Sequence, residues 1–174
     1  MAETDAELVA RTQSGQRAAF AEMVHRHVRW VGAVAAGVLG DLGAARDVVC
    51  ESFRRAFVSL SKLPDRRRFQ PWLYTITQRT ALDWLRSQQE SQPTTAIASV
   101  GSVEPEPHQR ALAEVLALPP HYREALLLRA IGGCTCAEVA HVTGGGSADA
   151  EARLARAEQA LARRLAASRI ATPR

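Results

Sequence analysis

Residues 135–154 read TCAEVAHVTGGGSADAEARL. Thr135 and Glu138 stand three positions apart ahead of an apolar stretch, which is the spacing of a capping box at the start of a helix. Three glycines at 144–146 interrupt the pattern, and a longer apolar pattern follows them. Two helices joined by a short glycine-containing turn form either a DNA-binding helix-turn-helix or an ordinary αα-hairpin. The stretch therefore predicts a helical unit, with DNA binding as one of its two interpretations.

Helical periodicity extends outward from this stretch in both directions. Towards the N-terminus, apolar residues recur at helical spacing over 20–38, 48–60 and 72–85, and no alternating strand pattern occurs. Within 48–60 we expect the following residues to face the core: Val48, Val49, Phe53, Ala56, Phe57 and Leu60. The segment SQPTTAIASVGSVEPEP (91–107) holds three prolines and lacks an apolar stripe, as is typical of a linker. The sequence thus predicts an all-α protein with two small domains, 1–90 and 108–174, joined by a linker over 91–107.

The composition excludes several protein classes. The 174 residues are 47% hydrophobic but contain no apolar run of the length that spans a membrane. The N-terminal MAETDAELVA is acidic and does not resemble a signal peptide. Three cysteines are too few for a disulfide framework. We therefore expect a soluble, cytoplasmic protein.

The positive charge is concentrated in one part of the chain. The net charge is +4, and eight basic residues against three acidic ones lie between 54 and 90. There Arg66-Arg67-Arg68 precedes Trp72, Tyr74 and Arg79, and arginines among aromatic rings suit a melted nucleic-acid strand. The alternatives are that Trp72 belongs to the core, that the arginines are solvated, and that arginine is abundant throughout.

Five fragments carry a family resemblance over nearly the whole chain. In order they are DAELVARTQSGQRAAFAEMVHRH (5–27), ARDVVCESFRRAF (45–57), FQPWLYTITQRTALDWLR (69–86), LALPPHYREALLLRAIGGCTCAEVAHVTG (116–144) and RLARAEQAL (153–161). Together they resemble the extracytoplasmic-function (ECF, group IV) sigma factors of bacterial RNA polymerase. The resemblance implies two helical domains, σ2 and a helix-turn-helix σ4, joined by a flexible linker.

The resemblance also implies three binding surfaces. The σ2 residues expected to bind core RNA polymerase are Arg46, Asp47, Val48, Cys50, Glu51, Phe53 and Arg54. Those expected to bind the −10 promoter element are Arg66, Arg67, Arg68, Trp72, Tyr74, Thr75, Gln78, Arg79, Asp83 and Arg86. Those of the helix-turn-helix at the −35 element are Thr135, Glu138, Ala148, Asp149, Glu151, Ala152, Arg153 and Arg156. The implied partners are core RNA polymerase, promoter DNA and an anti-sigma factor, which in this family is often membrane-bound. No small-molecule substrate and no cofactor is implied.

The chain departs from the family pattern at several of these positions. Cys50 stands where the family usually has Gln, and Arg79 where it usually has Asn. The recognition helix reads Asp-Ala-Glu-Ala-Arg-Leu over 149–154, where the family often has Thr-Val-Lys-Ser-Arg-Leu. Asp149 and Glu151 are repelled by phosphates, although they also suit a helix N-terminus, and Glu151 could accept a hydrogen bond from cytosine. Together with the small residues Gly145 and Ala150, this predicts a σ4 domain that keeps its fold but binds DNA weakly on its own.

Other chemistry has little support in the sequence. Cys134, Cys136 and His141 form at most a partial metal site, because a fourth ligand is missing and the spacing matches no common zinc pattern. The alternative is that both cysteines are small residues beside a helix cap. No nucleophile–base set or phosphate-binding glycine loop occurs, so we expect no enzyme activity. Besides a sigma subunit, a sigma-like interaction module that does not read promoters and a stand-alone DNA-binding regulator stay open.

Overall fold

The computed structural model describes residues 3–91, 107–143 and 145–170, and these residues form helices and no strand. The elements are α1 (Asp5–Gln13), α2 (Arg17–Leu39), α3 (Leu42–Ser59), η1 (Leu60–Lys62), η2 (Arg66–Arg68), α4 (Phe69–Ser91), α5 (Pro107–Leu116), α6 (Pro120–Ala130), α7 (Cys136–Thr143) and α8 (Ser147–Ile170). The all-α prediction is confirmed. Among these helices, none combines the length and the apolar character needed to cross a membrane.

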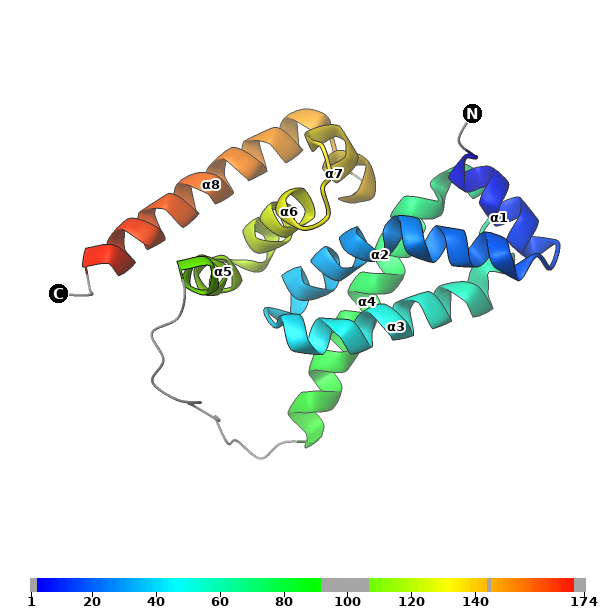
Figure 1. Cartoon of the computed structure of the whole chain (residues 1–174), viewed down its shortest axis with the longest axis horizontal. Helices are drawn as coiled ribbons and strands as arrows, with labels where there is room; N and C mark the ends of the chain where they lie inside the picture. Colours follow the sequence, from blue (N-terminus) through cyan, green and yellow to red (C-terminus); the bar gives the residue numbers. More distant parts are fainter. Residues whose placement is uncertain (1–2, 92–106, 144, 171–174) are drawn as a thin grey trace.

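Helix α2 is the centre of the N-terminal half (Figure 1). Its residues Val31, Val34, Ala35 and Ala36 are fully buried, because α1, α3, α4 and α6 all pack around it. The helix ends where Gly40 adopts the left-handed conformation (φ 72°), which glycine reaches without a Cβ penalty. The neighbouring helices therefore pack on the buried apolar residues of α2, and this packing fixes which of their faces point to solvent.

Helices α3 and α4 pack on α2 and on each other. Most of the stripe predicted on α3 is buried, as expected from its spacing. Phe57 is the exception, with 44% of its surface exposed. Its ring lies edge-on to Phe20 at 4.9 Å between centroids, so it covers the outside of the α2–α3 contact and does not enter the core.

The C-terminal half consists of α5 to α8 (Figure 1). The capping box predicted at Thr135 and Glu138 is present: the backbone N–H of Thr135 donates to Glu138 Oε2 at 2.7 Å, and that of Glu138 to Thr135 Oγ1 at 3.2 Å. Ala150, Leu154 and Ala157 bury the inner face of α8 against α6 and α7. Helices α7 and α8 thus have the order of a helix-turn-helix.

The two halves pack directly against each other. Helix α6 lies along α2, and α7 lies against α4 (Figure 1). One buried cluster runs from Val31 and Val34 of α2 to Leu128 of α6 and Val139 of α7. This cluster is shared by the two halves, and a second, smaller cluster lies within the C-terminal half and consists of Leu118, Ala125, Leu126, Leu154 and Ala157. The predicted linker falls almost entirely on 92–106, outside the described residues.

Candidate functional site

A basic loop precedes α4 and is held by α1. The Arg66 guanidinium donates from Nε to Gln13 Oε1 at 2.9 Å, and Gln13 in turn donates to the Leu60 carbonyl at 3.0 Å. Asp65 caps the short η2 turn by accepting from the Arg67 N–H at 2.9 Å. The side chains of all three arginines, 66–68, are exposed. The loop therefore presents a cluster of guanidinium groups on a fixed backbone.

These arginines are available for an anionic ligand. Among the described residues, neither the three loop arginines nor Arg79 forms an ion pair with a carboxylate. Beside the loop lies a hollow of about 430 Å³, lined by Leu63, Asp65, Arg68, Trp72 and Thr75 among others. An aromatic ring such as Trp72 can stack on an unpaired base, while neighbouring guanidinium groups bind the phosphates.

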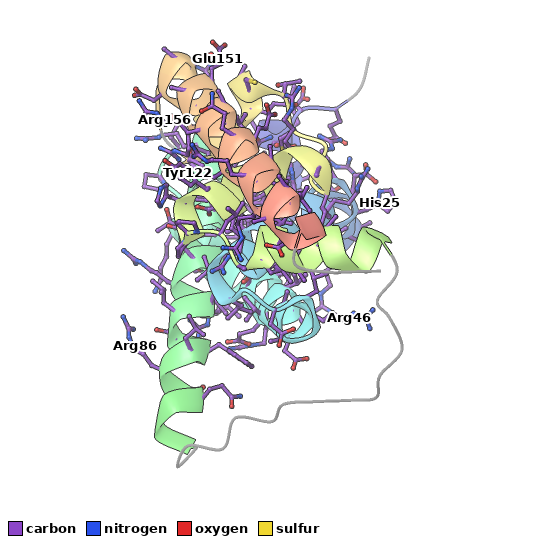
Figure 2. The ribbon with its side chains drawn as sticks, turned by 90° about the vertical axis from the view of Figure 1, so that its left-hand side faces the viewer. His25, Arg46, Arg86, Tyr122, Glu151 and Arg156 are labelled. Atoms are coloured by element: carbon purple, nitrogen blue, oxygen red, sulfur yellow. The ribbon has the colours of Figure 1, made fainter. Side chains whose placement is uncertain are left out.

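The predicted −10 residues on α4 divide between two faces. Thr75, Arg79, Asp83 and Arg86 are exposed, and Figure 2 shows the Arg86 side chain extending away from its helix. Trp72, Tyr74 and Gln78 are half-buried. Trp72 packs partly on the core, which agrees with its interpretation as a core residue. It also lines the hollow beside the basic loop. Gln78 donates to the Tyr74 hydroxyl at 2.6 Å, on the face turned towards the C-terminal half.

An ion-pair network joins the outer faces of α3 and α4. Glu51 accepts from Arg54 at 2.6 Å and from Arg55 at 2.8 Å, and Arg55 also donates to Asp83 at 2.7 Å. Hydrogen bonds from Arg54 and then Arg55 lower the pKa of Glu51 to about 2. Asp83 also accepts from Arg86 at 3.2 Å. Asp83 therefore ties α4 to α3 through Arg55, a role that the sequence did not indicate, while Arg86 pairs with Asp83 within α4.

The predicted polymerase-binding residues on α3 differ in exposure. Arg46, Asp47, Cys50 and Arg54 are exposed and Glu51 is half-exposed. The following two residues are core residues: Val48 (1% exposed) and Phe53 (6%). The prediction that these two bind a partner directly is corrected here, because their side chains face α2 and α4 and can only position the helix.

The helix-turn-helix residues lie as its geometry requires. Most predicted residues of α8 are exposed: Ala148, Asp149, Glu151, Ala152 and Arg156. Figure 2 shows Glu151 near one end of α8, directed outward. The small residue Ala150 is buried in the packing of α8, with 3% of its surface exposed. Arg153 is half-buried and lies close enough to Tyr74 and Glu124 to affect their pKa values.

The cysteines do not assemble a metal site. Among the described residues, no group of three or more His, Cys, Asp or Glu side chains is placed to hold a metal ion. Cys134 is buried, and burial, reinforced by the charge of Glu138, raises the pKa of its thiol. Cys136 receives an Arg129 guanidinium contact at 3.6 Å. This arrangement matches the alternative of small residues beside a helix cap.

Two residues that sequence reasoning did not single out join the halves of the molecule. Arg123 and Glu124, adjacent on α6, contact α2 and α4 respectively. Their partners lie 46 to 86 positions away in the chain, so no local spacing could have indicated these contacts.

Family models match both halves in order: Sigma-70 region 2 over residues 23–91 and Sigma-70, region 4 over residues 108–161. A probable RNA polymerase sigma factor RfaY of Xanthomonas campestris is 33% identical over 158 residues, which is 83% of this chain but only 40% of that protein. The ECF RNA polymerase sigma-E factor of Salmonella typhimurium is 28% identical over 177 residues, covering 91% of this chain and 92% of the relative.

Solved structures agree with these sequence matches. A structure of CnrH in complex with the cytosolic domain of CnrY covers 95% of this chain and 99% of its own, with a TM-score of 0.69 and 26% identity. The sigma factor RpoE in complex with the anti-sigma factor NepR from Bartonella quintana has a TM-score of 0.58 and 17% identity, covering 82% of this chain and 93% of its own. At that identity the second match speaks for the fold alone.

Proposed function

Because the chain belongs to the sigma-70 family, in its extracytoplasmic-function group, we propose that it joins core RNA polymerase and directs initiation at a specific set of promoters. The observation that carries this proposal is the ordered pair of region 2 and region 4 matches on one chain. In this proposal residues 1–90 form the region 2 domain, 91–107 the linker and 108–174 the region 4 domain. Catalysis belongs to the polymerase, the chain itself is not an enzyme, and it acts in the cytoplasm.

The exposed face of α3 is the proposed contact with core polymerase. Arg46, Asp47, Cys50, Glu51 and Arg54 present alternating charges there. The ion pairs of Glu51 with Arg54 and Arg55 preorganise that pattern, which lowers the ordering cost of binding. Burial of Val48 and Phe53 fixes the rotation of the helix, so the contact depends on the core beneath it.

The basic loop and the exposed face of α4 are the proposed −10 contact. The exposed guanidinium groups at 66–68 and at Arg79 supply phosphate contacts, and the hollow beside Trp72 supplies a stacking surface for an unpaired base. Arg79 adds a positive charge where the family usually has a neutral side chain. We therefore expect tighter backbone binding and a promoter preference of its own.

The outer face of α8 is the proposed −35 contact. Arg153 and Arg156 are its cationic side chains, while Asp149 and Glu151 oppose close approach to phosphates. The acidic start of this helix favours a second candidate function, a sigma-like module that binds polymerase or an anti-sigma factor without productive −35 recognition. An anti-sigma factor is the proposed inhibitor in either case, as the family resemblance implies.

A binding measurement with homologous core polymerase tests the proposal. Asp47→Lys reverses a charge on the exposed face of α3 without touching the core, and Glu158→Lys makes the same change on the exposed surface of α8. We expect the parent to bind tightly, Asp47→Lys to bind at least about tenfold more weakly, and Glu158→Lys to bind like the parent. Absence of binding by the parent, or equal losses in the two variants, contradicts the proposal.

A further inference from the structure

The two halves meet at a backbone-to-backbone contact that only glycine permits. A Cβ atom built on Gly37 of α2 would lie 2.8 Å from the Cα and 3.0 Å from the Cβ of Glu124 on α6. Backbone atoms of a packed helix cannot move aside as the end of a flexible side chain can. The close approach of α6 to α2 therefore depends on the missing side chain at position 37.

Arg123, the residue before Glu124, binds the end of α2. Its guanidinium donates from Nε to the Gly37 carbonyl at 2.6 Å and from Nη2 to the Val38 carbonyl at 3.1 Å. A third bond, from Nη1, reaches the Leu116 carbonyl at the end of α5 at 2.6 Å. Carbonyls at a helix C-terminus lack partners within their own helix and attract cations. Arg123 of the region 4 domain thus supplies hydrogen-bond donors to the C-terminal carbonyls of α2.

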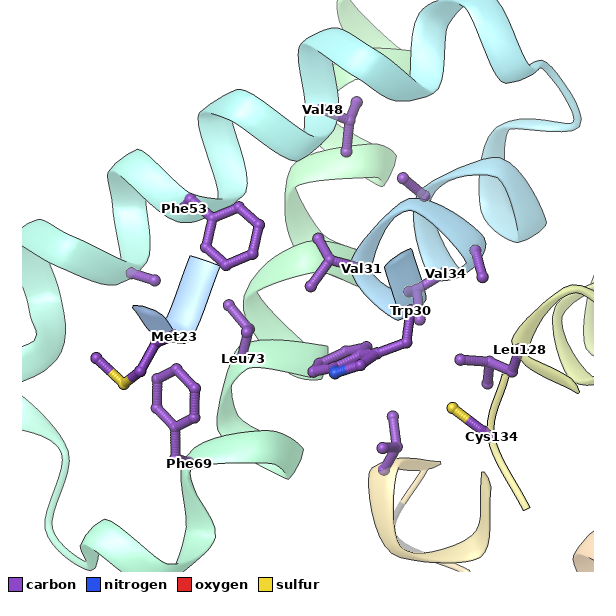
Figure 3. Close-up of a cluster of buried hydrophobic side chains, with 14 of the residues drawn as sticks. Met23, Trp30, Val31, Val34, Val48, Phe53, Phe69, Leu73, Leu128 and Cys134 are labelled. Atoms are coloured by element: carbon purple, nitrogen blue, oxygen red, sulfur yellow. The ribbon is translucent and has the colours of Figure 1, made fainter. Parts of the chain in front are cut away.

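The apolar part of the contact is continuous with the main core. Trp30 and Val34 of α2 lie in one buried cluster with Leu128 and Cys134 of the region 4 domain (Figure 3). Trp30 is 6% exposed, Val34 is fully buried and Cys134 is 9% exposed. Separation of the domains would expose these side chains together.

The contact also occupies residues that the proposed function assigns to DNA. Glu124 is 8% exposed, and Tyr74, Gln78 and Arg153 lie around its carboxylate. Burial raises the pKa of Glu124, and these three neighbours only partly offset that rise. Tyr74 and Gln78 are among the α4 residues expected to bind the −10 element, and Arg153 is among those expected at the −35 element, so residues of both sets lie around one carboxylate.

The arrangement with α6 packed on α2, called the closed form below, includes an unfavourable burial of a polar atom. Within the described part of the chain, Glu124 Oε1 is buried without a hydrogen-bond partner. A buried acceptor without a partner costs free energy that is recovered when the group returns to water. The contact therefore combines specific packing with a free-energy cost that favours separation of α6 from α2.

We propose that the packing of α6 on α2, through Gly37, Arg123 and Glu124, is a self-inhibiting contact that covers part of the −10 surface and must open before the protein directs initiation. This inference rests on the proposed function and names a regulation of the same surfaces. The region 4 domain acts as an intramolecular competitor of promoter DNA at Tyr74 and Gln78. Binding of −10 DNA then draws on the open form, so its apparent affinity is reduced by the fraction of closed molecules.

Three full-length variants test the inference. Gly37→Ala places the clashing Cβ in the contact, and Gly32→Ala is the matched control on the same helix, since its Cβ would meet only Val49 Cγ2 at 3.9 Å. Both changes add the same intrinsic helix preference. Glu124→Gln keeps the shape of the side chain and removes the buried charge. It therefore shifts the equilibrium the opposite way, towards the closed form.

Two readouts are needed. The first is the labelling rate of the Cys134 thiol, resolved by peptide mass spectrometry, with the exposed Cys50 as internal reference. The second is the affinity for single-stranded DNA. We expect Gly37→Ala to raise Cys134 labelling and single-stranded DNA affinity by about tenfold, the size of effect that overpacking of a tight contact produces. Gly32→Ala is expected to change neither, and Glu124→Gln to lower both.

The outcomes separate the two proposals. Equal Cys134 labelling in Gly37→Ala and Gly32→Ala overturns the closed contact. Faster labelling of Gly37→Ala with unchanged single-stranded DNA affinity overturns its inhibitory role. If no variant and no parent binds polymerase, the proposed function fails, and with it the inhibitory role, while the labelling rates still decide whether the contact exists. A urea unfolding curve for each variant excludes global unfolding as the cause of faster labelling.

Discussion

Replacing Asp5 with asparagine is expected to remove a pH-dependent part of the stability of the region 2 domain. Asp5, in the first turn of α1, accepts from Arg26 at 2.9 Å and from Gln70 at 2.9 Å, and His27 Nε2 lies 3.1 Å from its carboxylate. The Trp30 indole donates to His27 Nδ1 at 2.9 Å, which leaves Nε2 of His27 to carry a proton towards Asp5. One carboxylate therefore joins α1, α2 and α4.

The magnitude follows from the pKa of Asp5. Burial opposes ionisation, but His27, Gln70 and Arg26 outweigh it and lower the pKa from 3.8 to about 2. A lowered pKa stabilises the folded state above the unfolded value, and this stabilisation is lost as the pH falls from about 3.8 through about 2. The separation of the two values corresponds to about 2 kcal/mol of unfolding free energy at pH 7, of which about half is left at pH 3.

Urea unfolding of the parent and of Asp5→Asn at pH 7 and pH 3 measures this contribution. We expect the unfolding free energy of the parent to exceed that of Asp5→Asn by about 2 kcal/mol at pH 7 and by about 1 kcal/mol at pH 3. Taking the difference between the two proteins cancels the titration of all other carboxyl groups. A stability difference that is the same at both pH values would refute the reasoning, because it would place the pKa of Asp5 near its ordinary value.

Three further predictions concern the DNA-binding surfaces. Arg79→Ala is expected to weaken binding of single-stranded DNA. The slope of log K against log salt should fall by about 0.7, which is the share of one phosphate contact. Fluorescence anisotropy titrations at several salt concentrations measure both effects. Glu151→Lys is expected to strengthen non-specific duplex binding at fixed salt more than Glu158→Lys does, and an unchanged or weaker affinity would count against the proposed −35 surface. Thr135→Ala is expected to lower the free energy of unfolding by about 1 kcal/mol through loss of the helix cap, while Thr135→Ser keeps the cap and most of the stability in the same urea assay.

Features that depend on neighbouring residues were predictable from the sequence. The capping box of Thr135 with Glu138 was predicted from a spacing of three and is present at 2.7 and 3.2 Å. Helical stripes gave the helices and most of the core, because burial of a helix face repeats with the helical turn. Phe57 fits that stripe yet lies 44% exposed, because its ring packs on Phe20 at the edge of the α2–α3 contact.

Contacts between distant parts of the chain were not predictable in this way. The bonds of Arg123 to α2 span 85 and 86 positions, and nothing near Arg123 in the sequence distinguishes it from a surface arginine. Glu124 equally reads as a solvated charge, although it is buried against Tyr74 and Gln78. Family motifs assigned Asp83 to DNA, while its ion pair with Arg55 depends on how α3 and α4 pack.

Transcript-start mapping tests the central claim most directly. Homologous core polymerase is incubated with fragmented genomic DNA, with and without the full-length protein, and the 5′ ends of the transcripts are sequenced. A promoter-specificity subunit produces discrete starts that appear only with the protein and share sequence elements near −10 and −35. If the protein binds core polymerase and no new starts appear, promoter recognition is contradicted and the interaction-module alternative takes its place.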